Sequence, residues 1–151
     1  MSFRNRHHHA WAAALLLVFT APAFAADAQY STQLDPSAFD NSTVKNNVGI
    51  GHVSATLSGS TLTITGDYSG MNFNATGAQV KLGLAKGEPG HVIGALKVTG
   101  GTSGQISGSI KLTSVQVKAL NLGDISVVVN NEKAGEFGSL WGWLAGNNLT
   151  S

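Results

Sequence analysis

The sequence predicts an all-β fold, an antiparallel arrangement of about seven short strands with one short helix. Apolar and polar residues alternate with a period of two over most of the chain after residue 48, which is typical of strands with one buried face. All 19 glycines lie after Ala25, and glycine at that density marks turns and bulges between strands. These observations are compatible with a two-layer sandwich or with a flattened barrel.

The first 25 residues have the layout of a secretory signal peptide. A basic start carries Arg4 and Arg6, an apolar run covers residues 10–21, and Ala23 and Ala25 form a small-x-small cleavage pattern. The apolar run is too short to anchor the chain in a bilayer. We therefore expect cleavage after Ala25, export to the periplasm or outside the cell, and no integral membrane segment in the mature chain.

Charge and cysteine content narrow the possible classes of function. The chain after the leader has seven lysines and eight carboxylates, so its formal net charge is −1 and nothing indicates a nucleic-acid partner. Cysteine is absent, which excludes disulfides and a thiol nucleophile. The mature chain has 126 residues, enough for one domain that is held together by packing.

Residues 26–47 are polar and show no sustained period, and we interpret them as a partly ordered N-terminal extension. The domain proper is predicted to cover residues 48–146, followed by a C-terminal tail at 147–151. Its first two strands, at 52–57 and 61–68, form a hairpin around the turn sequence SGS. Further strands are expected at 78–85, 91–98, 104–112, 124–131 and 136–144.

The segment TSVQVKALNLG interrupts this period of two. Its apolar residues fall at helical offsets, and Thr113 and Gln116 have the spacing of a capping box. Gly123 suits the left-handed residue that ends a helix. The sequence therefore predicts one short helix near 114–121.

Four landmarks occur in a characteristic order between Gly49 and Leu144. They are the hairpin ATLSGSTLTITGDYSGM, the turn GEPGHVI, the block TSGQISGSIKLTSVQVKALNLGDISVVV and the end GSLWGWL. In this order they resemble the CHRD domain, the module named after chordin, and Leu112, Thr113 and Gln116 match the family's Leu-Thr-x-x-Gln frame. The resemblance implies a Greek-key-like antiparallel β-sandwich, similar in shape to immunoglobulin domains and copper/zinc superoxide dismutase. It also implies an exported, non-enzymatic binding or structural module.

The same resemblance indicates where a metal site would lie. Family members often carry histidines at three positions that correspond here to Gln79, Lys81 and Asn130. By alternation all three face outward and could share a surface, but none is a good transition-metal ligand, and the lysine ammonium would repel a cation. We therefore expect no metal and no cofactor, and we keep a copper/zinc or superoxide-handling role only as an alternative.

Phe137, Trp141 and Trp143 stand at alternating positions near the end of a chain that has few aromatic residues. Alignment with the family places both tryptophans where other members carry polar, outward-facing residues. Outward rings suit contact with a protein partner or stacking on a glycan, so these residues are the predicted binding surface. A carbohydrate-binding or adhesive module is the second alternative. The opposite interpretation is that residues 26–47 fold over the rings and bury them.

No catalytic residue is predicted. His52 and His91 are the only histidines after the leader, they are far apart, and they lack metal-ligand spacing, so we interpret them as ordinary surface residues. The carboxylates lie mostly in turns, and no serine sits in a Gly-x-Ser-x-Gly elbow.

Overall fold

The structure is a computed structural model that describes residues 15–18, 26–37, 41, 44–85, 88 and 90–147. The predicted leader, apart from residues 15–18, and most of the predicted C-terminal tail lie outside these ranges. None of the helices in the described ranges is long and apolar enough to span a membrane.

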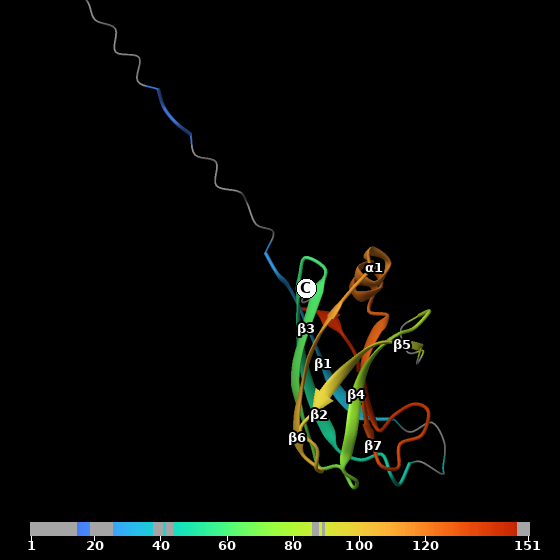
Figure 1. The fold of residues 1–151 in the computed structure, drawn as a ribbon. Coiled ribbons are helices and arrows are strands. Elements are labelled where there is room, and N and C mark those ends of the chain that lie inside the picture. The colour runs from blue at the N-terminus through green and yellow to red at the C-terminus, as the bar shows by residue number, and fades with distance from the viewer. Residues whose placement is uncertain are drawn as a thin grey trace, which may run out of the picture.

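Strands dominate the described residues, with one helix among them (Figure 1). In chain order the elements are β1 Ala28–Pro36, β2 Ile50–Ser58, β3 Thr61–Ser69, β4 Ala75–Leu82, β5 His91–Val98, β6 Gly104–Lys111, α1 Ser114–Leu122, β7 Ile125–Asn131, β8 Leu140–Trp143 and β9 Ala145–Gly146.

The sheet closes on itself. Its strands follow the order β2-β3-β6-β5-β4-β7-β8-β1, and β1 also pairs with β2, so eight antiparallel strands form a closed barrel. The two-residue β9 pairs with β1 beyond the end of β8. The all-β class and the single short helix are confirmed, but the predicted open Greek-key sandwich is wrong, because the strands close into one barrel and form no separate layers.

β1 is the strand that closes the barrel. Its residues Ala28–Leu34 pair in continuous register with β2, and its last two residues pair with β8. Tyr30 and Leu34 point inward and are buried. Residues 28–36 of the predicted extension therefore form a strand of the barrel. Thr32 lies among the inward-facing residues of β1, and because it is polar the sequence of this strand does not show the usual alternation of apolar and polar residues.

Side chains fill the interior of the barrel. An eight-stranded barrel is just wide enough for its inward side chains to pack against one another. The inward rows of the strands supply the core, and the helix adds Leu120 at one end. Its largest fully buried members are Tyr68, Leu34, Leu62, Ile64, Ile106, Leu120, Ile125, Leu140 and Leu144.

The helix begins and ends as its sequence predicts. The Thr113 hydroxyl accepts a bond from the Gln116 backbone N–H at 3.2 Å, and the Gln116 side chain accepts one from the Thr113 N–H at 2.9 Å. Gly123 ends the helix with φ 80°. In Figure 1, α1 lies at one end of the barrel, and the long connection between β7 and β8 lies at the other.

Candidate functional site

The aromatic residues near the C-terminus lie on the outer wall of the barrel, half-buried. β8 covers only Leu140–Trp143, so Phe137 belongs to the turn before it and not to the same strand face. Leu140 is buried in the barrel, while Trp141 and Trp143 take the outward positions. Their ring centroids are 4.4 Å apart with an interplanar angle of 62°, an edge-to-face pair.

These rings and the connection before β8 enclose outward-facing residues of β7. Val128 points away from the core and is Trp141's partner in the register, yet it is only 1% exposed. The connection folds back over it, since a Cβ added to Gly138 would lie 2.2 Å from Val128 Cγ1. The Trp143 indole nitrogen is buried and has no hydrogen-bond partner in the structure. The aromatic residues thus form a small outer packing cluster, and an edge-to-face pair is not a flat platform for stacking a sugar.

The positions that match the family's histidines share one outer surface. Gln79 and Lys81 of β4 pair with Val128 and Ser126 of β7, and Asn130 pairs opposite Gly77 on the same face. Lys81 is 8% exposed, and its Nζ donates to the Glu136 carbonyl oxygen at 3.3 Å. The lysine thus ties the β7–β8 connection to the barrel wall.

The two histidines do not meet. His52 Nδ1 lies 3.6 Å from Asp67 Oδ1, and both side chains are exposed. His52 pairs with Asp67 in the register, and Asp67 pairs with Gln105, which places His52 at the end of the barrel where β5 ends. His91 is the first residue of β5 and therefore lies toward the opposite end. Across the described ranges, no group of three or more His, Cys, Asp or Glu side chains is placed to hold a metal ion.

The site that sequence reasoning missed is a groove where the barrel wall opens. β5 and β6 pair only at Lys97↔Ser107 and Val98↔Ile106, although β6 pairs with β3 along its whole length. On the β4 side, β5 stays paired from His91 to Leu96. Backbone groups of β5 and β6 that face one another across the gap therefore lack ladder partners between these two strands.

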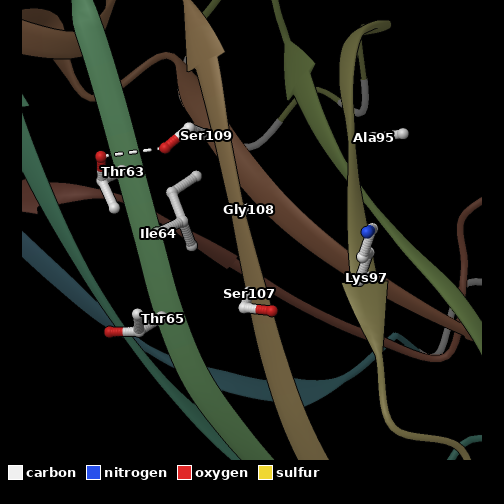
Figure 2. A pocket seen from close by; sticks show the side chains of 8 residues that line it. All are labelled: Thr63, Ile64, Thr65, Ala95, Lys97, Ser107, Gly108 and Ser109. Atoms are coloured by element: carbon white, nitrogen blue, oxygen red, sulfur yellow. Dashed lines mark hydrogen bonds between the residues drawn. The ribbon is translucent and has the colours of Figure 1, made fainter.

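We call the hollow over this gap the seam groove. Its volume is about 530 Å³, and its lining comes from β3, β6 and β5 (Figure 2). The lining residues are Thr63, Ile64, Thr65, Ala95, Lys97, Ser107, Gly108 and Ser109.

Core side chains seal the inner side of the gap. A Cβ added to Gly94 would lie 2.4 Å from Ile110 Cγ2, and one added to Gly108 would lie 2.7 Å from Leu96 Cδ2. These aliphatic side chains pass behind the gap and Ile64 of the core lines the hollow, so core side chains form the floor of the seam groove.

Five of the eight residues that line the seam groove have polar side chains, and Ile64, Ala95 and Gly108 supply apolar surface between them. Thr63 and Thr65 of β3 and Ser107 and Ser109 of β6 are exposed and face outward, and Lys97 stands across from them on β5. Thr63 Oγ1 and Ser109 Oγ are 3.0 Å apart and share a hydrogen bond. Each hydroxyl can donate and accept, but the lining includes no histidine or carboxylate to activate one as a nucleophile. This lining can therefore bind a polar ligand but does not provide the usual catalytic groups.

Comparison of the chain with protein-family models, with curated proteins and with solved structures finds no match in any of the three. The resemblance to the CHRD domain therefore rests on the sequence landmarks alone and stays a hypothesis.

Proposed function

We propose that this protein is an exported, non-enzymatic binding module that holds carbohydrate in the seam groove. The observation that carries the proposal is the row of four exposed hydroxyls beside a gap in the barrel wall, where backbone donors and acceptors lack ladder partners. The leader-like first 25 residues support export, and the resemblance to CHRD modules supports binding without catalysis.

The packed interior favours a ligand on the outer wall. Small barrels that bind ligands inside leave a cavity there, whereas the core of this barrel is filled by its own side chains. The seam groove has a volume of about 530 Å³, which is within the range of small-ligand sites.

Carbohydrate suits the hydroxyl groups of this lining. Serine and threonine hydroxyls stand about 7 Å apart along a strand and about 5 Å apart between neighbouring strands, a regular array of donors and acceptors. These side chains are short and stand on paired strands, so little conformational entropy is lost when they bind. A ligand with many hydroxyls can meet both this array and the open backbone edges.

The aromatic residues are a weaker choice for the contact surface. Trp141 and Trp143 are half-buried and pack edge to face, and their position encloses Val128. We therefore assign the aromatic cluster a structural role and place ligand contact at the seam groove.

The test is binding of the mature protein to a polysaccharide panel, measured by isothermal titration calorimetry. Thr63→Val removes one groove hydroxyl at nearly constant shape, and we expect it to weaken binding by about 3- to 10-fold, as for the loss of one hydrogen bond. Thr56→Val is the matched control. This variant also removes a threonine that makes an exposed side-chain bond, here to Gln29 Oε1 at 2.9 Å. Thr56 is the register partner of Thr63 on β2 but is not part of the groove lining, so the control also tests whether the contact is confined to the lining.

Two results would contradict the proposal. One is that no polysaccharide binds. The other is that Thr63→Val and Thr56→Val bind alike while Trp141→Phe loses binding, which would move the contact surface to the aromatic cluster. Unfolding curves of each variant establish that the protein tested is folded.

A further inference from the structure

We infer that the carbohydrate held in the seam groove is acidic, a polysaccharide that carries carboxylate or sulfate groups. This inference rests on the proposed function and adds the charge of the ligand. It comes from the cations at the groove and from the absence of carboxylates in its lining.

Two lysines flank the row of hydroxyls. Lys97 lines the groove from β5, next to the point where β5 and β6 begin to pair. Lys111 lies two residues beyond Ser109 on the outward row of β6, opposite Thr61 in the register. Both lysines are exposed, and among the described residues neither makes an ion pair.

Carboxylates lie outside the lining of the seam groove. None of the eight lining residues is acidic. The first carboxylate along β3 is Asp67, two residues beyond Thr65 on the outward row and outside the lining, where it lies 3.6 Å from His52 Nδ1 on the neighbouring strand. An anion in the groove would therefore meet the Lys97 ammonium group and no carboxylate from the lining, with Lys111 two residues beyond Ser109 on β6.

This charge arrangement is local to the groove. The chain after the predicted leader has a formal net charge of −1, so the protein as a whole does not attract anions. A lysine ammonium is a compact charge on a flexible side chain, and it can form an ionic contact with either a carboxylate or a sulfate. Each exposed contact of this kind contributes about two- to fivefold in affinity, and repeats along a polymer increase the total by multivalency.

The experiment compares neutral and acidic polymers on the mature protein. Dextran is the neutral probe, dextran sulfate carries sulfates on the same chain, and polygalacturonate carries carboxylates. We expect at least one acidic polymer to bind at least fivefold more tightly than dextran at low salt, and its advantage to shrink as salt rises. Whichever of dextran sulfate and polygalacturonate binds more tightly identifies the acidic group as sulfate or carboxylate.

Lys97→Gln is the informative variant because it removes the charge and keeps most of the stem. We expect it to weaken binding of the acidic polymer two- to fivefold and so to reduce the advantage of that polymer over dextran. Lys118→Gln, at an exposed position on α1 outside the groove, is the matched control and should bind like the unmodified protein.

The outcomes separate this inference from the proposed function. If dextran binds as tightly as both acidic polymers, or Lys97→Gln and Lys118→Gln behave alike, the acidic ligand is ruled out while Thr63→Val still tests the groove. If no polymer of any charge binds, both proposals fail.

Discussion

At the scale of single residues, glycine decides how closely strands approach in this barrel. Gly142 faces inward between Trp141 and Trp143, and a Cβ there would lie 2.3 Å from the Gln33 carbonyl oxygen and 2.7 Å from Thr32 Oγ1. The backbone of β1 thus occupies the space that a side chain on β8 would need. The spacing of the two tryptophans around a glycine is explained by closure of the barrel.

Gly142→Ala should lower the free energy of unfolding by about 1–3 kcal/mol, because the added methyl group must displace backbone. Gly77→Ala is the control, since nothing lies within 4 Å of its added Cβ and its φ is not positive. Gly77→Ala should be neutral or slightly stabilising. Urea denaturation measures both variants, and equal losses would refute the close approach of β1 to β8.

At the scale of elements, one hydrogen bond connects the strand that closes the barrel with the helix at its end. The Tyr30 hydroxyl of β1 donates to Asn121 Oδ1 of α1 at 2.5 Å. Burial raises the pKa of Tyr30 above its ordinary value of 10.0, because desolvation disfavours the phenolate. The folded protein therefore holds Tyr30 neutral at a pH where the unfolded chain ionises it.

This shift has a definite sign in stability. The contribution of neutral Tyr30 is fully present below pH 10.0, the unfolded-state pKa, and is lost as pH rises through the folded-state pKa. The unmodified protein should therefore lose stability relative to Tyr30→Phe as pH rises above 10.0. Chemical denaturation at several pH values measures the difference. A gap between the two proteins that stays constant over this range would contradict the assignment.

Elements differed in how far the sequence alone could predict them. The helix was predictable because Thr113, Gln116 and Gly123 determine its ends through local hydrogen bonds. β1 was not predicted, because Thr32 interrupts its apolar row and its partners lie in β2 and β8, distant in sequence. The position of Phe137 was wrong for a similar reason, since a turn replaces the start of the expected strand.

At the scale of the whole molecule, closure by β1 should be visible in stability. Leu34 is fully buried in β1, and Leu34→Ala should cost about 2–5 kcal/mol of unfolding free energy. Val44→Ala is the control, because Val44 belongs to the same predicted extension but is 43% exposed. Its cost should stay within about 0.5 kcal/mol. Similar small losses for both variants, in urea denaturation, would mean that residues 28–36 are not part of the core.

The seam groove also belongs to the scale of the whole molecule. Its hydroxyls were visible in the sequence as the polar faces of two alternating segments, with Thr63 and Thr65 in one and Ser107 and Ser109 in the other. Alternation gives the face of each residue but not its neighbours in space. Only the pairing of β3 with β6, and the divergence of β5 from β6, brings these hydroxyls and Lys97 together.

The sequence by itself determined the local features of this protein: the period of two that makes strands, the glycine-marked turns and the capped helix. These depend on interactions between residues close along the chain. Only the tertiary structure decided that the strands close into a barrel, that the rings pack on its outer wall, and that a polar groove opens between β5 and β6. Such features depend on pairing between distant segments, and the alternation of a single strand does not specify its partner.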